Sequence, residues 1–486
     1  MTVDRRTFPV VSTAHLELTA GGTAMTMTMT MTTATARQAA SAQENRPLLI
    51  KGGIVVTLES AGVLRNADVL IEGRSIVDVG KHLAVEGAEI VDARNMIVLP
   101  GFVDAHRHCW QGAIRNIAVD TDLSGYFGHI LAHLAPRYRP EDVYAGTLSN
   151  DAEALDAGVT TVYDWAHIMN SPAHADEAVR AHRESGIRTV FGYGFPNLSP
   201  EWSYESRKAL RREDVARVRE TYFTGNDGVL TMGLALRGPE HMSTFDVTCS
   251  DWALARELAL PVSVHVGTGP GGIKYQAIRR MDAAGLLFEG ANYVHCVTLS
   301  EEDRRRIRDS GGHCISTPAV EMVMDFGIPA INNSLAAGIR PGLGSDVVTT
   351  TGGDMFTQMR AAHQVARMHA YWESDKKYVP VTAADVLRFA TIDGARAIGL
   401  DSKIGSLKAG KRADLILLRT DRLAFSPLND PIGAVVSTAT AADVDTVIVD
   451  GTIKKRAGKL VGIDPAAVAA KAASSGAYLS SQMSLG

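Results

Sequence analysis

Two histidines follow an apolar run in the segment VLPGFVDAHRHCWQG, which covers residues 98–112. His106 and His108 are separated by one residue, and alternate side chains of a β-strand point to the same side. Both imidazoles therefore project from one face at the end of a buried strand. Paired imidazoles are typical ligands of a divalent metal ion, which needs further ligands from other parts of the chain.

Three more residues with metal-binding side chains end apolar, strand-like segments. His265 ends PVSVH, His295 ends NYVH, and Asp346 ends GLGSD. Imidazole and carboxylate groups are the usual ligands of a catalytic divalent metal, which keeps one coordination position open for water. A single histidine at a strand end is more often a core residue than a ligand, but five such positions favour a metal site.

The strand-like segments alternate with helix-prone stretches, as βα units do. Eight strands are predicted from MIVLPGFVDAH, VTTVYDWAH, RTVFGYG, GVLTMGLAL, PVSVHVG, NYVHC, GHCIST and IRPGLGSD. Their number and spacing predict an α/β fold with a (β/α)8 TIM barrel over residues 96–400. Active sites of such barrels lie at the carboxyl ends of the strands, where the five candidate residues fall.

Both ends of the chain contain further short, alternating strands separated by glycine-rich turns. Residues 47–95 and 401–465 predict two parts of one small β-sandwich domain. Residues 1–46 include MTMTMTMTTATARQAASAQ, which has no hydrophobic periodicity, and we expect a disordered N-terminal tail. Residues 466–486 are predicted to be a C-terminal tail.

The composition limits the classes of function. A net charge of −5 gives no reason to expect binding to nucleic acid or to a membrane surface. No apolar run reaches the roughly 18 residues that span a bilayer. The four cysteines include no CxxC pair, so neither a disulfide framework nor a zinc ribbon is indicated. We expect a cytoplasmic protein that acts on a small molecule.

The motifs PGFVDAHRH, the strand-end His265 and His295, the SD pair at Asp346, and the closing GSLKAGKRADL resemble those of the amidohydrolase superfamily. The similarity is greatest to the branch of triazine hydrolases, cytosine deaminase and S-adenosylhomocysteine deaminase, and it covers about residues 48–462. It implies a barrel beside a β-sandwich, and formation of homo-oligomers. The implied ligands of one metal are His106, His108, His265 and Asp346. His295 would lie close to the metal and polarise the substrate.

Two departures from this family pattern affect the predicted chemistry. Binuclear members carry a carboxylated lysine at the end of the fourth strand, but GVLTMGLALRGP contains none, so we expect one metal ion. Zinc is the expected ion, although iron, cobalt and manganese also suit these ligands. Deaminases of the branch carry a glutamate three residues after the fifth-strand histidine, whereas this chain has Thr268. A hydroxyl cannot replace a carboxylate as a general acid or base near neutral pH.

The absence of a glutamate at position 268 favours a simpler hydrolysis. We predict cleavage of a urea, carbamate, thiocarbamate or anilide C–N bond in a small apolar compound by metal-activated water. Asp346 would move the water proton to the leaving group, and His295 would stabilise the developing oxyanion. TTVYDWAHIMNSPAHADEAVRAHRESGIR, TPAVEMVMDFG and GDMFTQMRAAHQ also resemble phenylurea and molinate (thiocarbamate) hydrolases, which lack that glutamate.

Two alternatives remain open. The first is an aminohydrolase or dechlorinating hydrolase of a heteroaromatic ring of the triazine, pterin or nucleobase type, with Glu321 or His167 in place of the missing glutamate. The second is an inactive barrel that serves as a binding module, although folding alone does not require the five site residues. Substrate contacts are predicted for Trp110, Gln111, Trp165, His167, Thr268 and Glu321, while the competing role of Glu321 is a salt bridge or a helix N-terminus.

Overall fold

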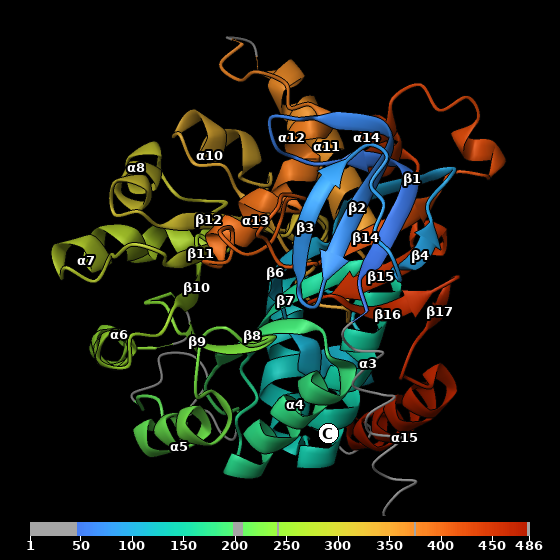
Figure 1. The fold of residues 1–486 in the computed structure, drawn as a ribbon. Helices are drawn as coiled ribbons and strands as arrows, with labels where there is room; N and C mark the ends of the chain where they lie inside the picture. Colours follow the sequence, from blue (N-terminus) through green and yellow to red (C-terminus); the bar gives the residue numbers. More distant parts are fainter. Residues whose placement is uncertain (1–45, 198–207, 241–242, 374–375, 484–486) are drawn as a thin grey trace, which may run out of the picture. The chain divides into compact units, whose positions relative to one another are not determined.

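The computed structural model describes residues 46–197, 208–240, 243–373 and 376–483, and these residues form two β-sheets with surrounding helices (Figure 1). Residues 1–45, which hold nearly all of the predicted N-terminal tail, lie outside the described part. No helix among the described residues is long and apolar enough to cross a lipid bilayer.

The first sheet is a barrel of eight parallel strands, which confirms the predicted fold class. In barrel order its strands are β6 (Phe102–Arg107), β7 (Val159–Ala166), β8 (Arg188–Tyr193), β9 (Leu230–Leu236), β10 (Val262–Val266), β11 (Asn292–His295), β12 (His313–Ser316) and β13 (Gly342–Leu343). The ring closes beyond β13, where the amide of Asp346 donates to the carbonyl of His106 at 2.9 Å and the amide of His108 donates to the carbonyl of Asp346 at 2.9 Å.

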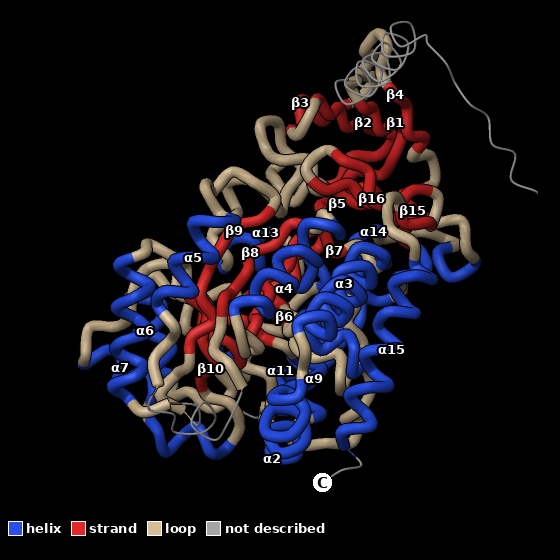
Figure 2. The backbone as a smooth tube through the Cα atoms, turned by 90° about the horizontal axis from the view of Figure 1, so that it is seen from below, coloured by secondary structure: helices blue, strands red, loops and turns tan. Residues whose placement is uncertain are grey.

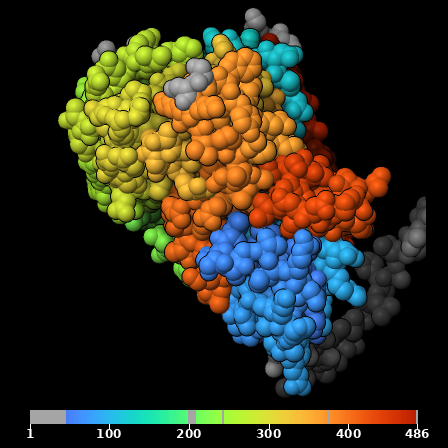
Figure 3. Space-filling view, turned by 90° about the horizontal axis from the view of Figure 1, so that it is seen from above, coloured from blue at the N-terminus to red at the C-terminus, as the bar shows by residue number. Residues whose placement is uncertain are grey.

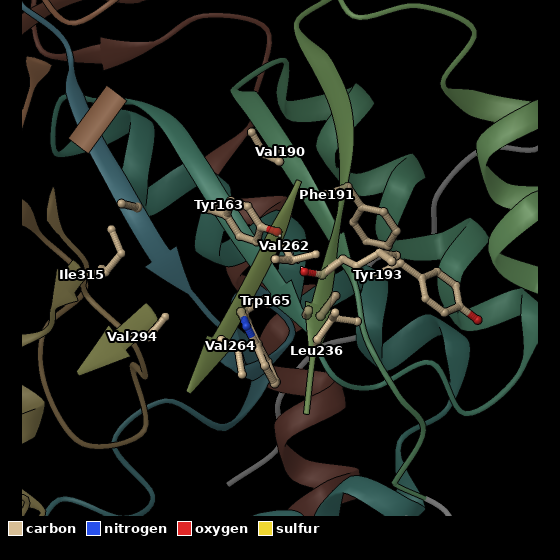
Figure 4. Packing of buried hydrophobic residues seen from close by; sticks show 14 of the residues in the cluster. Tyr163, Trp165, Val190, Phe191, Tyr193, Leu236, Val262, Val264, Val294 and Ile315 are labelled. Atoms are coloured by element: carbon tan, nitrogen blue, oxygen red, sulfur yellow. Dashed lines mark hydrogen bonds between the residues drawn. The ribbon is translucent and has the colours of Figure 1, made fainter. Parts of the chain in front are cut away.

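The barrel interior is filled by large side chains from alternate strand positions (Figure 4). Tyr163 and Trp165 of β7 are fully buried and lie beside Val262 and Val264 of β10. A Cβ at Gly192 would lie 2.7 Å from the Tyr163 ring, so the neighbouring strand needs a glycine to let that ring pack. The barrel is thus a packed core, and its open space lies at the strand ends.

Helices cover the outside of the barrel (Figure 2). The α-helices are α2 (Leu123–Tyr126), α3 (Pro140–Asp156), α4 (Pro172–Ser185), α5 (Arg212–Tyr222), α6 (Phe245–Glu257), α7 (Ala277–Ala283), α8 (Glu301–Asp309), α9 (Pro318–Val323), α10 (Ile331–Ala336), α11 (Met355–Trp372), α12 (Ala383–Phe389), α13 (Ile392–Ala397), α14 (Pro431–Ser437) and α15 (Pro465–Met483). The short 3-10 and π segments are η1 (Cys109–Ile114), η2 (Phe127–Leu134), η3 (Ala135–Arg137), η4 (Pro270–Tyr275), η5 (Leu423–Phe425) and η6 (Ala441–Asp443).

The second sheet is built from both ends of the described chain, as predicted. Residues from these two ends, blue and orange-red, lie side by side in Figure 3. Its nine strands are β1 (Leu48–Val56), β2 (Val63–Glu72), β3 (Ser75–Gly80), β4 (Glu89–Asp92), β5 (Met96–Pro100), β14 (Leu415–Arg419), β15 (Val444–Val449), β16 (Thr452–Arg456) and β17 (Lys459–Leu460). The side chains of β14 alternate between two cores, with Leu415 and Leu417 in one and Ile416 and Leu418 in the other. Both faces of this strand are therefore buried.

Two segments differ from their predicted assignments. The segment MIVLPGFVDAH, expected to be one barrel strand from residue 96, forms β5 of the second sheet and β6 of the barrel. The chain changes sheet at Gly101, where a Cβ would lie 2.1 Å from the Thr160 hydroxyl oxygen. The change of sheet cannot be recognised in the sequence, because both strands are buried and together read as one apolar run.

The second difference concerns residues 466–486, predicted to be a tail, most of which form α15. This alanine-rich helix packs on α3 and η1 and buries Val468, Ser475 and Leu479. A Cβ at Gly476 would lie 2.7 Å from the carbonyl oxygen of Ala113, so a small residue permits the close approach. The helix has few large apolar side chains, and this concealed its packing in the sequence.

A buried ion-pair cluster joins the barrel to the second sheet. Arg188, at the start of β8, contacts both oxygens of Asp414 at 2.7 and 2.9 Å and one oxygen of Asp450 at 2.8 Å. Arg188 and Asp414 are 3% and 1% exposed, so water does not screen them. Removing the guanidinium would leave the buried Asp414 carboxylate without its ionic partner, while Asp450 would keep its ion pair with Arg74.

We predict that Arg188→Met lowers the free energy of unfolding by about 3–5 kcal/mol, because it leaves the buried charge of Asp414 unpaired. Arg419→Met is the matched control, since Arg419 pairs with Asp421 at the surface with both side chains 52% exposed. The control should cost less than about 1 kcal/mol. Urea denaturation of both variants measures the difference, and equal losses would contradict this account of the junction.

Candidate active site

The candidate ligands come together at the carboxyl ends of the barrel strands. His106 Nε2 lies 3.1 Å from His265 Nε2, and Asp346 Oδ1 lies 3.3 Å from the Nε2 atoms of both His106 and His108. His295 Nε2 lies 3.9 Å from Asp346 Oδ2. All five predicted residues thus converge from β6, β10, β11 and the segment after β13.

The spacing of these atoms fits a shared cation. Two ligands about 2.0–2.1 Å from a tetrahedral zinc ion are separated by roughly 3.3 Å, close to the separations at this site. A set with ligand atoms within 4.8 Å of one another contains His106, His265, His295 and Asp346. This set contains His295 and leaves out His108, whose Nε2 nevertheless lies 3.3 Å from Asp346 Oδ1. Four of the five groups suffice for one ion.

The protonation states also suit metal binding. Burial lowers the pKa of His106 to about 4, against the opposing effect of Asp346, and burial beside other imidazoles holds the pKa of His265 well below its usual range. Both rings are therefore neutral at pH 7 and offer a lone pair. Burial opposes ionisation of Asp346, but the adjacent imidazoles of His106 and His108 hold its pKa well below the ordinary value.

Hydrogen bonds orient the ring of His108. Its Nδ1 lies 2.8 Å from the carbonyl oxygen of Trp165, which can only accept a hydrogen bond. In the neutral ring the proton is then on Nδ1, and the lone pair is on Nε2, which faces Asp346. Trp165 also packs its ring 4.1 Å from that of His265, so one residue of β7 supports two of the imidazoles.

A buried network behind the ligands fixes the strands that carry them. Asp104 accepts hydrogen bonds from the amide of Ser345 at 2.9 Å and from its hydroxyl at 2.5 Å. Arg107 lies between the two histidines in sequence but contacts Asp104, Asn150 and the backbone carbonyl of residue 353 outside the barrel. Alternation thus turns Arg107 away from His106 and His108, and the pairing of β6 with β7 is irregular between Asp104 and Arg107, where these two side chains meet.

Two of the site residues have an unusual backbone. His295 and Asp346 have φ angles of +73° and +63°, in the left-handed region that non-glycine residues rarely occupy. Each such residue costs on the order of 1–3 kcal/mol and persists where the surrounding structure demands it. Here the turn directs both side chains into the strand-end cavity instead of along the strand.

Glu321 lies behind His295 rather than in the cavity. Its carboxylate accepts hydrogen bonds from the Ser316 hydroxyl and the Thr317 amide, both at 2.8 Å, and lies 3.3 Å from His295 Nδ1. The carboxylate is therefore occupied by the strand-end turn after β12 and orients the imidazole. Such an arrangement positions His295 but leaves little freedom for Glu321 to reach a substrate.

The candidate cavity opens beside these groups and has a largely apolar, aromatic wall. Its lining comprises His108, Leu123, Tyr126, Phe127, Leu131, His167, Glu240, His265, Thr268, His295, Met324, Phe326, Asp346 and Val347. Of the predicted substrate contacts, His167 and Thr268 line this cavity. Trp110, Gln111, Trp165 and Glu321 are not among the lining residues: Gln111 donates to the Tyr126 hydroxyl, and Trp110 packs on Tyr138.

Glu240 is a lining residue that the sequence analysis did not identify. It follows β9 by four positions, and its side chain is buried. The signal in the sequence is a single acidic residue shortly after the fourth barrel strand, at the end of GLALRGPE. An acidic residue in a loop has many possible surface roles, so the sequence alone could not assign it.

A comparison with family models matches residues 97–454 to the amidohydrolase family. The chain belongs to this family. Curated relatives include 5-methylthioadenosine/S-adenosylhomocysteine deaminases of Acetivibrio thermocellus, 32% identical over 77% of this chain and 85% of the relative, and of Carboxydothermus hydrogenoformans, 29% identical over 86% and 94%. A 5'-deoxyadenosine deaminase of Methanothermobacter thermautotrophicus is 28% identical over 86% of this chain and 95% of the relative.

Solved structures of the same fold give consistent matches. A zinc-bound adenosine deaminase of Xanthomonas campestris has a TM-score of 0.80 at 24% identity and covers 89% of this chain and 98% of its own. A variant of the atrazine chlorohydrolase of Arthrobacter aurescens, complexed with zinc and atraton, has a TM-score of 0.80 at 22% identity, with 88% and 100% covered.

The relatives and solved structures indicate which branch of the amidohydrolases this chain resembles. This amidohydrolase is similar to the triazine hydrolase and deaminase branch, as the motifs indicated. The finer resemblance to phenylurea and molinate hydrolases finds no support among these relatives, which are deaminases by name.

We expect the purified amidohydrolase to bind one zinc ion per chain. His265→Ala and Asp346→Asn should each reduce the bound zinc at least tenfold at equal free zinc, because each removes a donor from the shared site. His82→Gln, at an exposed histidine in the loop after β3, is the control. Elemental analysis after dialysis measures the metal content, and unchanged zinc in both site variants would contradict the ligand assignment.

Proposed function

We propose that this amidohydrolase is a metal-dependent aminohydrolase that replaces an amino group on a ring carbon of a neutral, nitrogen-containing heteroaromatic compound with oxygen. The observation that carries the proposal is the cavity itself: imidazoles and Asp346 converge at one end, and most of the remaining wall is aromatic and apolar. The names of the curated relatives support the same class, since their stated substrates contain an adenine ring.

The character of the cavity wall supports an uncharged, planar substrate. Tyr126, Phe127 and Phe326 offer aromatic surface against which a flat ring can pack. Among the described lining residues there is no lysine or arginine to pair with a phosphate or carboxylate. A substrate with an anionic group near the ring would lose its hydration without gaining an ionic partner.

The residues that would hold the metal are His106, His108 and His265 with Asp346. When bound, a divalent cation lowers the pKa of water from about 16 toward 7. Asp346 would hold the proton released by the water and give it to the departing amino group. His295, oriented by Glu321 at 3.3 Å, would stabilise negative charge on the attacking oxygen, a contribution typically worth a factor of about 10²–10³.

A second candidate is hydrolysis of an N-substituted urea, carbamate, thiocarbamate or anilide. The observation that favours it is Thr268, which lines the cavity where related deaminases carry a glutamate. Acyl-type substrates need no proton on a ring nitrogen, so such a reaction could proceed without that carboxylate. Both candidates share the same metal ligands and differ in the bond that breaks.

We expect the zinc-loaded enzyme to release ammonia from aminated heteroaromatic compounds such as adenosine, 5-methylthioadenosine or aminotriazines. N,N-dimethyl-N′-phenylurea, which has no primary amino group, serves as the contrasting substrate. Coupled detection of ammonia and chromatography of aniline distinguish the two reactions, and a chelator should abolish either. Aniline release without ammonia from any ring compound would overturn the proposal in favour of the second candidate.

A further inference from the structure

The cavity contains one carboxylate that the metal site does not use. Glu240 stands in the loop after β9, on the cavity wall with His265 and His295, and its side chain is 4% exposed. It comes from a different strand than any of the metal ligands. A buried acid at this position is costly unless it is paired or has a chemical task.

The two oxygens of Glu240 have different surroundings. Oε2 accepts a hydrogen bond from the amide of Gly267 at 2.8 Å, and the amide of Thr268 also donates to the carboxylate. Oε1 is buried and has no hydrogen-bond partner among the described residues. One oxygen thus anchors the side chain, while the other keeps its capacity to accept or donate a proton.

The anchoring amides bring this carboxylate next to residue 268. In the deaminases that the chain resembles, that residue is itself the glutamate that moves protons. Here Thr268 supplies only its backbone amide, and the carboxylate arrives from Glu240 instead. A Cβ at Gly272 would lie 3.1 Å from Glu240 Oε2, so the glycine leaves space for the incoming side chain.

We propose that Glu240 is the proton-transferring catalytic residue of this site and replaces, from the β9 loop, the carboxylate that is absent at Thr268. This inference rests on the proposed aminohydrolase function. As the water oxygen bonds to the ring carbon, Glu240 takes one water proton and gives it to the adjacent ring nitrogen. The bond to the amino group then breaks, and that group leaves as ammonia with the second water proton. The ring keeps the oxygen as a carbonyl, and Glu240 returns to its starting form.

The ionisation of Glu240 agrees with this role. Burial raises its pKa to about 7, and the amides of Gly267 and Thr268 lower it only in part. The protonated and ionised forms are then both populated near neutral pH, which is the condition under which a carboxylate exchanges protons most efficiently.

Glu240→Gln tests the role, because the amide keeps the shape of the side chain but cannot transfer a proton. We expect kcat for ammonia release to fall by about 10²–10⁴-fold, with zinc content unchanged. The inflection near pH 7 in the wild-type profile should disappear from the variant. Glu220→Gln, an exposed position on α5, is the matched control and should keep the wild-type rate and profile.

A double variant separates proton transfer from mere packing. Glu240→Gln combined with Thr268→Glu moves the carboxylate to position 268. We expect the kcat of this double variant to be at least tenfold higher than that of Glu240→Gln alone. A Glu240→Gln enzyme with wild-type kcat and pH profile would overturn the inference. A second result would also overturn it: a folded, zinc-loaded double variant that is no faster than Glu240→Gln alone.

An infrared measurement tests Glu240 without any substrate. The carbonyl band of a protonated carboxyl group should titrate near pH 7 in the wild type and be missing in Glu240→Gln. If the wild-type enzyme shows this band but releases only aniline from ureas, the proposed function fails while the ionisation of Glu240 stands. If ammonia is released but Glu240→Gln is as fast as the wild type, the function stands and the role of Glu240 fails.

Discussion

The site depends on the closure of the barrel between its first and last strands. Two backbone hydrogen bonds of Asp346, to the carbonyl of His106 and from the amide of His108, join the end of β6 to the segment beyond β13, both at 2.9 Å. The same pair fixes three candidate ligands, because His106, His108 and Asp346 are carried by the residues that form it. The side-chain bridge from Asp104 to Ser345 repeats this link one layer deeper. The contacts that close the barrel therefore also assemble the site, and a shift in register between β6 and the segment after β13 would disrupt both.

The junction between β6 and the segment after β13 is surrounded by buried charged and polar side chains that pair with one another. Arg107 satisfies Asp104, Asn150 and Glu153 outside the barrel, and His182 bridges Asp151 and Asp164 at 2.8 and 2.9 Å. Burial opposes the charge on His182, but the two carboxylates raise its pKa to about 10. Asp164 in turn accepts from the amide of Cys109, directly after His108. These paired groups hold the turn that presents the ligands, so the imidazoles at the cavity can stay neutral and available.

The fold and the metal-ligand positions could be predicted from the sequence wherever strand periodicity and residues at strand ends indicate them. Alternation in a strand predicts that His106 and His108 share a face, and the βα pattern places His265, His295 and Asp346 at the same end of a barrel. It could not show that Met96–Pro100 belongs to the other sheet, because apolar runs look alike in either core. It could not assign Glu321 to His295, since that contact depends on a turn after β12. Glu240 escaped prediction because its partners, the amides of residues 267 and 268, carry no side-chain signal.

A chemical requirement need not be met by the residue that usually meets it. The reaction of a ring amine demands an oxygen that can carry a proton beside the reacting carbon, and that demand concerns a position in space. The backbone at Gly267 and Thr268 offers amide donors, which would attract a carboxylate from any segment within reach. Glu240 reaches them from β9, the strand next to β10 in the barrel. Neighbouring strands of a closed parallel sheet bring their carboxyl ends together, so a residue lost from one strand can be supplied by the next. Motif comparison, which follows the chain, misses such a replacement, whereas the arrangement of side chains around the cavity reveals it.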